Sequence, residues 1–265
     1  MMDLTIDGAA CRIAASGAAD GPPLLLVHGA ANDRDAWRDV TPLLAAAGLR
    51  VLAPDLPGHG ASHGSPLASV ESLAAWTLRL ADTLGLQRFA LAGHSMGSLV
   101  ALDAASREPD RIRHLSLLGS AVPMPVSPQL LDMAANQPDA ACRMVTLWSH
   151  TPGFLLAGSG GHGVWGAGKT LAVMRRNRHT LAGDLENCNR YAGGLAAAAR
   201  VSCPSLLVLG RRDRMTPLRS VQALEAALPQ VQRCEIADCG HAMMVEKPRE
   251  VASAILAGIT PTLAQ

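Results

Sequence analysis

The stretch Gly93-His94-Ser95-Met96-Gly97 decides the fold of this chain. It follows the apolar run 89–92 and precedes residues 99–105, whose apolar side chains recur at helical spacing. A serine between two glycines at a strand–turn–helix junction is typical of a nucleophile elbow, in which a strained turn lifts the hydroxyl out of the sheet. Side chains at the two glycine positions would collide there. The stretch therefore predicts that Ser95 is a nucleophile.

Further apolar runs place this turn in a larger sheet. An opening hairpin is expected at 4–6 and 11–14, joined by Asp7-Gly8. Other strands are expected at 22–27, 49–53, 114–119, 204–209 and 231–236, and helices at 35–47, 73–84 and 248–256. Strands that alternate with helices predict the α/β class, with a mainly parallel sheet of about eight strands flanked by helices. Ligands of such sheets bind beyond the carboxyl ends of the strands.

Residues 121–200 break this alternation. The segment begins with three prolines, is rich in glycine in its middle, and is otherwise helical in pattern. We expect one domain over residues 1–265, with a core of 1–120 and 201–265 and a helical cap, or lid, inserted at 121–200.

Two later loops supply the partners that a serine nucleophile needs, a base and a residue that orients the base. Asp213 follows the strand predicted at 204–209, and His241 follows the one at 231–236. Asp238 is the alternative acid, but it lies only three residues before His241 and is expected to be too close in sequence to reach round the ring. The candidate triad is therefore Ser95, Asp213 and His241.

The chain resembles the α/β-hydrolase fold family in five motifs that occur in the expected order. They are His28-Gly29 with Trp37, 55–60 with Ser62, 93–97, Gly210 with Asp213 and Pro217, and Gly240-His241 with Glu246 and Pro248. The resemblance implies that Ser95 is the nucleophile, that His241 is general base and then general acid, and that Asp213 orients the imidazole. It also implies an oxyanion hole made by the backbone N–H groups of Ala30 and Met96. The chain departs from many relatives at Ser98, where they carry a second glycine.

Several residues near the expected mouth of the site are candidates for substrate contacts: His28, Gly29, His94, Met124 and Met243. For the histidines, His59 included, hydrogen-bonded structural roles are the alternative. His59 and His63 are four apart, but Gly60 and Gly64 argue against a helix that would pair them on a metal. We expect neither a metal nor a cofactor.

The stretch 163–170 matches the phosphate-loop pattern G-x-x-x-x-G-K-[ST]. That pattern needs a strand directly before it, and the strands are already assigned to another sheet. A flexible cap loop is the expected use of these glycines, with nucleotide binding as the alternative.

The cap also carries a basic run at 175–179 and a net charge of +3, from seven basic and four acidic side chains. Such a run indicates either a solvated helix face or a cap that attracts a carboxylate-bearing substrate.

Composition limits the classes of partner and the location that the protein can have. The formal net charge of +1 and the 3% of aromatic residues argue against nucleic-acid and membrane partners, so a small-molecule substrate is expected. The first residues lack the pattern of a signal peptide, and the six cysteines form no C-x-x-C pair. We therefore expect reduced thiols and a cytoplasmic location.

Together these features predict a serine hydrolase that cleaves a small carboxylic ester with a mostly apolar acyl group. Relatives of this fold also cleave C–C bonds, thioesters, lactones and amides. Those that cleave ring-fission products often carry an aromatic residue after the catalytic histidine, where this chain has Ala242. Dehalogenases and epoxide hydrolases use an aspartate nucleophile, which Ser95 argues against. A non-catalytic ligand receptor is the alternative from another class.

Overall fold

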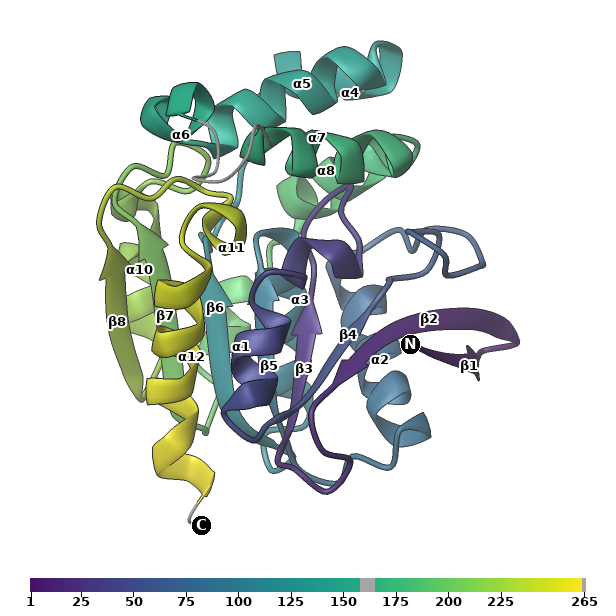
Figure 1. Ribbon diagram of the computed structural model, residues 1–265, viewed down its shortest axis with the longest axis vertical. Coiled ribbons are helices and arrows are strands. Elements are labelled where there is room, and N and C mark those ends of the chain that lie inside the picture. Colours follow the sequence, from purple (N-terminus) through teal and green to yellow (C-terminus); the bar gives the residue numbers. More distant parts are fainter. Residues whose placement is uncertain (158–164, 264–265) are drawn as a thin grey trace.

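The computed structural model describes residues 1–157 and 165–263. An eight-stranded sheet runs through the centre with helices on both faces (Figure 1). The strands are β1 (Met2–Ile6), β2 (Ala9–Ser16), β3 (Pro23–Val27), β4 (Arg50–Pro54), β5 (Phe89–His94), β6 (Ile112–Leu118), β7 (Ser205–Gly210) and β8 (Val231–Ile236).

The strand order is β1-β2-β4-β3-β5-β6-β7-β8. β1 and β2 form an antiparallel hairpin, β2 pairs with β4 antiparallel, and all other pairs are parallel. Each strand lies within a few residues of its predicted range. The fold class predicted from the sequence is confirmed.

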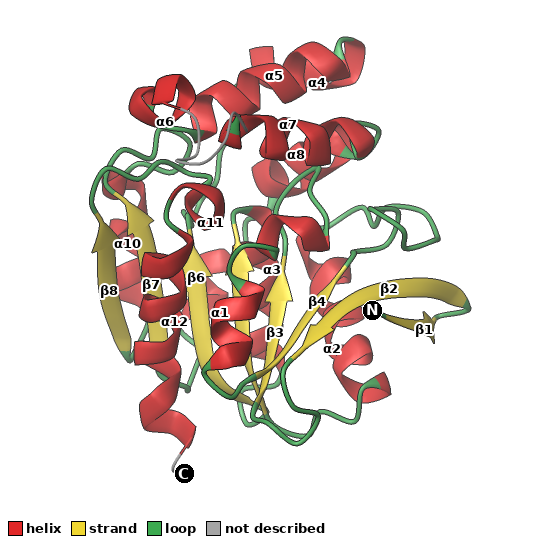
Figure 2. Ribbon diagram, in the orientation of Figure 1, coloured by secondary structure: helices red, strands yellow, loops and turns green. Residues whose placement is uncertain are grey.

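Two helical layers cover the sheet (Figure 2). One face carries α2 (Val70–Thr83), α3 (Met96–Arg107), α9 (Gly194–Ala198) and α10 (Gln222–Ala227), preceded by the short η2 (Leu218–Val221). The other carries α1 (Thr41–Ala46), α11 (Met243–Glu246) and α12 (Pro248–Leu263). Every residue of β5 is buried, as expected for a parallel strand covered on both sides.

The single helix predicted at 35–47 is wrong. The structure has a 3₁₀ helix, η1 (Arg34–Trp37), and then α1, which starts at Thr41. Pro42 explains the break, because proline lacks an N–H donor and is tolerated only in the first turn of a helix. Gly48, with φ of +92°, follows α1 as predicted.

Of the helices between β6 and β7 in the described part of the chain, five lie over the carboxyl edge of the sheet (Figure 1). They are α4 (Pro128–Asn136), α5 (Pro138–Ser149), α6 (Pro152–Ala157), α7 (Gly166–Arg176) and α8 (Leu181–Arg190). Four of them, α4, α5, α7 and α8, share a small apolar core that includes Leu130, Cys142 and Leu181 and also Ala31 of the loop after β3. We call these five helices the cap helices.

The phosphate-loop pattern at 163–170 lies partly outside the described residues. Its described part, from Gly166 onward, begins α7, and the element before it in the chain is the helix α6. The strand that the pattern requires is therefore not found there in the described part of the chain.

Within residues 1–157 and 165–263, no helix combines the length and apolar character that a bilayer span requires. All six cysteines are unpaired, and all except Cys234 are buried.

Candidate active site

Ser95 occupies the sharp turn between β5 and α3. Its φ of +54° lies in the left-handed region, which is uncommon for a residue with a side chain. A Cβ on Gly93 would come within 2.0 Å of the Gly97 carbonyl oxygen, and one on Gly97 within 2.4 Å of the Val27 oxygen. Both flanking positions therefore require glycine, as the elbow motif predicts.

His241 and Asp213 meet beyond the ends of β8 and β7. The two side chains are buried, and Nδ1 of His241 lies 2.8 Å from Oδ2 of Asp213. A carboxylate only accepts hydrogen bonds, so Nδ1 carries the proton and Nε2 is left with a free lone pair. The ring is thus held in the tautomer that a general base requires.

Asp213 is itself held by the loop that follows it. Its Oδ1 accepts the N–H groups of Met215 and Thr216, both at 2.8 Å, and its Oδ2 accepts the Thr216 hydroxyl at 2.8 Å. Burial raises the pKa of Asp213, but the His241 ring and the Thr216 hydrogen bonds outweigh it and lower the pKa overall. The carboxyl group is therefore ionised at neutral pH.

Two further residues fit around the imidazole. Gly119, with φ of +54°, directly follows β6, and a Cβ there would lie 3.0 Å from Nδ1 and Cε1 of His241. His94 donates from Nε2 to the His241 carbonyl oxygen at 2.8 Å. Burial, and then the proximity of His241, lower the pKa of His94 to about 3. His94 is therefore neutral beside the site.

Thr216 and Gly119 were not singled out from the sequence. The available signal for each was position alone, since Gly119 directly follows β6 and Thr216 lies in the loop after β7, beyond Asp213.

The loop after β3 lies beside the elbow and carries Ala30. A Cβ on Gly29 would lie 3.1 Å from both the Ser95 Cβ and the His94 carbonyl oxygen, so the two loops are in close contact. Met96 is the first residue of α3, where the backbone N–H groups have no partner within the helix. Both proposed oxyanion donors thus belong to segments that border Ser95.

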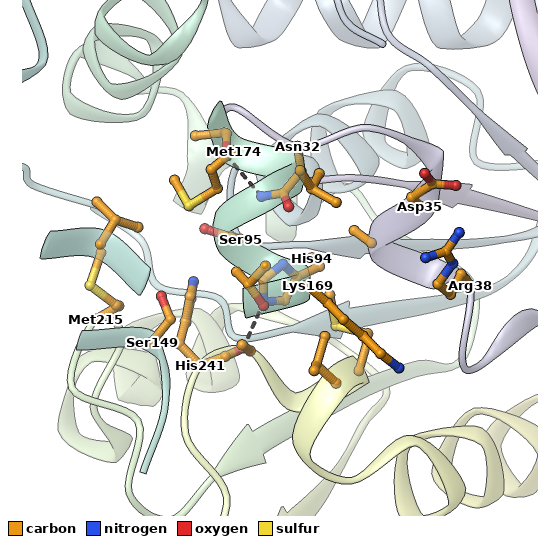
Figure 3. A pocket seen from close by; sticks show the side chains of 18 of the residues that line it. Asn32, Asp35, Arg38, His94, Ser95, Ser149, Lys169, Met174, Met215 and His241 are labelled. Carbon is orange, nitrogen blue, oxygen red and sulfur yellow. Dashed lines mark hydrogen bonds between the residues drawn. The ribbon is translucent and has the colours of Figure 1, made fainter. Parts of the chain in front are cut away.

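Two pockets meet at Ser95 and His241. The α7 pocket, of about 830 Å³ including its opening to solvent, is lined mainly by apolar side chains and also by Asp35, Arg38 and Lys169 (Figure 3). The α4 pocket, of about 670 Å³, lies on the other side and includes Arg214. Apolar residues of the α7 pocket include Val145, Val173, Met174 and Met244, and those of the α4 pocket Met124, Val126, Leu130 and Trp148.

Both pockets share Ala30, Ser95, Leu185, Met215 and His241. Leu185 comes from α8 of the cap helices, and Met215 from the loop after β7. Among the described residues, no cluster of three or more His, Cys, Asp or Glu side chains is arranged to hold a metal ion.

The predicted substrate contacts divide into two groups. His94 lines the α7 pocket and Met124 the α4 pocket. His28, Gly29 and Met243 line neither of these two pockets, and their contact with substrate stays a prediction.

The reasons differ from residue to residue. His28 is fully buried, accepts the Leu56 N–H at Nε2 (3.1 Å) and donates from Nδ1 to the Gly29 carbonyl (2.9 Å), which is the structural alternative. Met243 is packed in the core, and its neighbour Met244 faces the pocket instead, because adjacent residues of a helix point in different directions.

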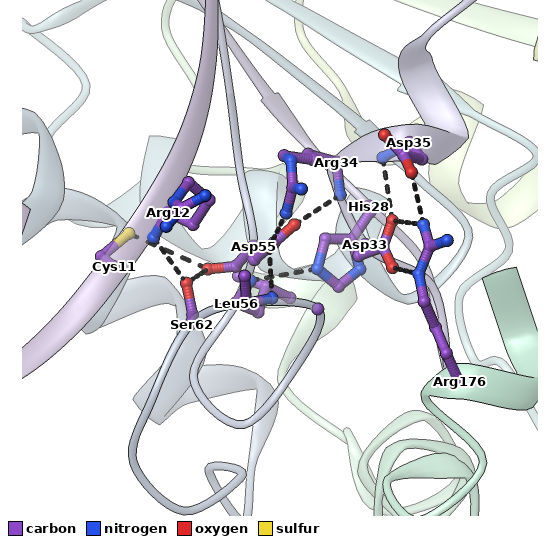
Figure 4. Close-up of polar contacts among 12 residues, drawn as sticks. Cys11, Arg12, His28, Asp33, Arg34, Asp35, Asp55, Leu56, Ser62 and Arg176 are labelled. Atoms are coloured by element: carbon purple, nitrogen blue, oxygen red, sulfur yellow. Dashed lines mark hydrogen bonds and ion pairs between the residues drawn. The ribbon is translucent and has the colours of Figure 1, made fainter. Parts of the chain in front are cut away.

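The basic run of the cap binds acids of the chain. Arg176 contacts both oxygens of the fully buried Asp33, at 2.6 and 2.8 Å, and also Asp35 at 2.5 Å (Figure 4). Asn177 donates to Asp33 as well, at 2.8 Å. Arg175 pairs with Asp139 within the cap. The end of α7 thus ties the cap helices to the loop after β3, which neither interpretation of the run anticipated.

A second tie joins the cap to the histidine loop. Glu246 accepts hydrogen bonds from the N–H groups of Thr151 (2.7 Å) and Gly240 (3.2 Å). The residue before His241 is thereby connected to the segment between α5 and α6.

A family model described as the alpha/beta hydrolase family matches residues 24–254. A pimeloyl-(acyl-carrier protein) methyl ester esterase of Aromatoleum aromaticum is 31% identical over 87% of this chain and 95% of its own length. A 2-hydroxymuconate semialdehyde hydrolase of a Pseudomonas species is 29% identical over 89% and 86%.

The solved structures agree. That of a thermophilic esterase from Thermogutta terrifontis superposes with a TM-score of 0.86 and 25% sequence identity, and covers 99% of both chains. The family match extends over most of the core and all five cap helices, and the three similar enzymes named above are hydrolases. The chain therefore belongs to the alpha/beta hydrolase family and is a hydrolytic enzyme.

Proposed function

We propose that this enzyme hydrolyses carboxylic esters through a Ser95–His241–Asp213 triad and an acyl-enzyme. The observation that carries the proposal is that the strained serine and the imidazole, whose Nδ1 proton is held by a buried carboxylate, both line the same two mainly apolar pockets. The esterases among the similar proteins support the choice of an ester.

Acylation begins when the Ser95 hydroxyl attacks the ester carbonyl carbon and its proton moves to Nε2 of His241. The carbonyl oxygen becomes an oxyanion and accepts hydrogen bonds from the N–H groups of Ala30 and Met96, each worth roughly 3 kcal/mol in the transition state. When the intermediate collapses, the C–O bond to the alkoxy group breaks and His241 returns the proton to the departing alcohol.

Deacylation repeats these steps with water. His241 takes a proton from the water as its oxygen attacks the acyl carbon, and the second intermediate releases the carboxylic acid and restores the Ser95 hydroxyl. Asp213 stays ionised throughout and stabilises the imidazolium form of His241.

The two pockets support an ester with an apolar group on each side of the scissile bond. Because both begin at Ser95, one takes the acyl chain and the other the alkoxy group of the same molecule. Burial of each additional methylene adds about 0.8 kcal/mol of binding until the pocket is filled.

A labelling experiment tests the proposal directly. A fluorophosphonate probe reacts with activated serines, so we expect it to label the wild type and Ser202→Ala, which changes an exposed serine, but not Ser95→Ala. A panel of p-nitrophenyl esters of increasing acyl length is then expected to show a rise in kcat/KM followed by a fall, with Ser95→Ala inactive throughout.

The same experiments identify the alternatives. An unlabelled wild type without esterase activity contradicts the proposal. Tight retention of an ester without turnover indicates a receptor, and a thermal shift with ATP indicates a nucleotide site. Preferred cleavage of a C–C bond in a diketo acid keeps the triad but changes the substrate class.

A further inference from the structure

The cap helices carry one buried carboxylate that is not part of the proposed triad. It lies on the side of the cap helices that faces the core. Asp184, in the first turn of α8, is 1% exposed and lies against the loop after β3. Burial of a charge is strongly unfavourable unless partners satisfy it. The partners of Asp184 therefore indicate what the residue does.

All three hydrogen-bond partners meet one oxygen. Oδ2 of Asp184 accepts the Ala31 N–H at 2.8 Å, the Thr180 hydroxyl at 2.9 Å and Nε2–H of His59 at 2.9 Å. Thr180 belongs to the cap, whereas Ala31 and His59 belong to two loops of the core. Asp184 thus joins the cap to both of those loops.

His59 completes an ion pair with this carboxylate. Its Nδ1 lies 3.0 Å from the Pro57 carbonyl oxygen, so both ring nitrogens face acceptors and both must carry protons. Burial lowers the pKa of His59, but the charge and hydrogen bond of Asp184 outweigh it, and the pKa is raised overall. The pair is a buried imidazolium and carboxylate, in which each charge needs the other.

The Asp184 contact fixes one of the two peptide units that flank the Cα of Ala30. In the Ala30–Ala31 unit, the N–H is held by Asp184, and the carbonyl oxygen accepts Nδ2–H of Asn32 at 2.9 Å. Ala31 itself has φ of +49°, a conformation that a non-glycine residue keeps only where its surroundings hold it.

The preceding Gly29–Ala30 unit carries the N–H that serves as the oxyanion donor. Its carbonyl oxygen accepts hydrogen bonds from the His28 ring at 2.9 Å and from the Asn32 N–H at 3.2 Å. In a trans peptide the N–H points away from the carbonyl, so this anchoring also sets the direction of the Ala30 N–H. If the Ala30–Ala31 peptide unit rotates, the Cα of Ala30, which both units share, passes the rotation on to the Ala30 N–H.

We propose that Asp184 is a positioning residue of the oxyanion hole, which fixes the Ala30 N–H by holding the Ala31 N–H from the cap. The inference rests on the proposed function, in which Ala30 is an oxyanion donor. It assigns to α8 a part in stabilising the transition state, in addition to its contribution of Leu185 to both pocket walls.

The test compares Asp184→Ala and Asp184→Asn with Glu186→Gln. Glu186 lies on the same helix, but its partner is the exposed Arg190, so it serves as the matched control. Three constants are measured: kcat and KM for the best ester, and the Ki of a trifluoromethyl ketone with the same acyl group. The ketone adds to Ser95 and places an oxyanion in the hole, whereas KM reports mainly the pockets.

For Asp184→Ala we expect kcat to fall 10- to 100-fold, which is less than for complete loss of a donor. KM should stay within threefold of the wild type, and Ki should rise by the same factor by which kcat/KM falls. Asp184→Asn retains an acceptor for the Ala31 N–H, so its loss is expected to be three- to tenfold. Glu186→Gln is expected to match the wild type.

A rise in KM with kcat and Ki unchanged would assign Asp184 to substrate binding and overturn the inference. If the wild type hydrolyses esters but Asp184→Ala has the same kcat and Ki as Glu186→Gln, the inference is also overturned. If Asp184→Ala does not fold, Asp184→Asn decides: parallel losses of threefold or more in kcat and Ki support the inference, and equality with Glu186→Gln overturns it. A wild type that neither hydrolyses esters nor binds the ketone contradicts the proposed function instead.

Discussion

Substitution of Gly119 by alanine tests the position of the His241 imidazole, the proposed general base. Two effects are expected, one on stability and one on activity. The residue has φ of +54°, and a Cβ there costs roughly 1–2 kcal/mol of backbone strain. For a domain of this size, that lowers Tm by about 2–8 °C.

The effect on activity follows from a contact distance. The new Cβ would lie 3.0 Å from Nδ1 and Cε1 of His241, where ordinary contact begins at 3.4 Å, so the ring must shift by about 0.4 Å. A misplacement of about 1 Å costs about 100-fold in rate, so a shift of this size predicts a fall in kcat/KM of about tenfold. The Nδ1 atom that moves is the one bonded to Asp213 at 2.8 Å.

Gly85→Ala is the matched control. Gly85 also has a positive φ, +70°, but a Cβ there would meet no atom within 4 Å. Both variants should lose similar stability in thermal denaturation, and only Gly119→Ala should lose activity in an ester assay at 25 °C. If Gly119→Ala keeps a kcat/KM within twofold of that of Gly85→Ala, the inferred placement of the imidazole is wrong.

Three other predictions follow from the same contacts. Asp213→Asn should lower kcat by about 10⁴-fold by favouring the wrong tautomer of the base, whereas Asp238→Asn, at an exposed acid, should leave it unchanged; equal losses in steady-state assays would contradict the assignment. Burial raises the pKa of Asp33, but Arg176 and Asn177 outweigh it and lower the pKa overall. The ionised Asp33 therefore contributes to folding stability above about pH 4, and this contribution is lost as the pH falls. Arg176→Met should therefore lower Tm at pH 7 by an amount equivalent to about 1 kcal/mol, allowing for the partial exposure of Arg176, and by less at pH 3; a pH-independent difference in a thermal-shift series would refute this. Because the paired arginines of the cap are neutralised by acids of the chain, kcat/KM for a carboxylate-bearing ester should change less than twofold between about 0.02 and 0.5 M salt, and a steep fall would restore the cationic-cap hypothesis.

The sheet was predictable because its strands leave little ambiguity. A short apolar run that is buried on both faces, such as the one that forms β5, carries its own signal and needs no knowledge of its neighbours. The helix expected at 35–47 failed for a local reason, since its apolar spacing continues through Pro42 although the backbone cannot.

The site was predictable where chain order determines it. Ser95, Asp213 and His241 each follow a strand, and parallel strands bring their carboxyl ends to one edge. The contacts of the cap were not predictable in this way. Asp184 and Ala31 are 153 residues apart, and no spacing in the sequence indicates which loop a cap acid will meet. The pairing of Arg176 with Asp33 likewise depends on how the cap docks.

The place of the cap helices in the chain bears on how this enzyme can be redesigned. The cap helices interrupt the chain between β6 and β7, after the proposed nucleophile and before the proposed acid and base, so their replacement leaves the order of the proposed triad intact. A chimera with a foreign cap would nevertheless remove the acceptor of the Ala31 amide and the partner of His59. Transplants that retain an acid at the position of Asp184 should keep turnover while exchanging selectivity, and those without it should bind new esters yet process them slowly.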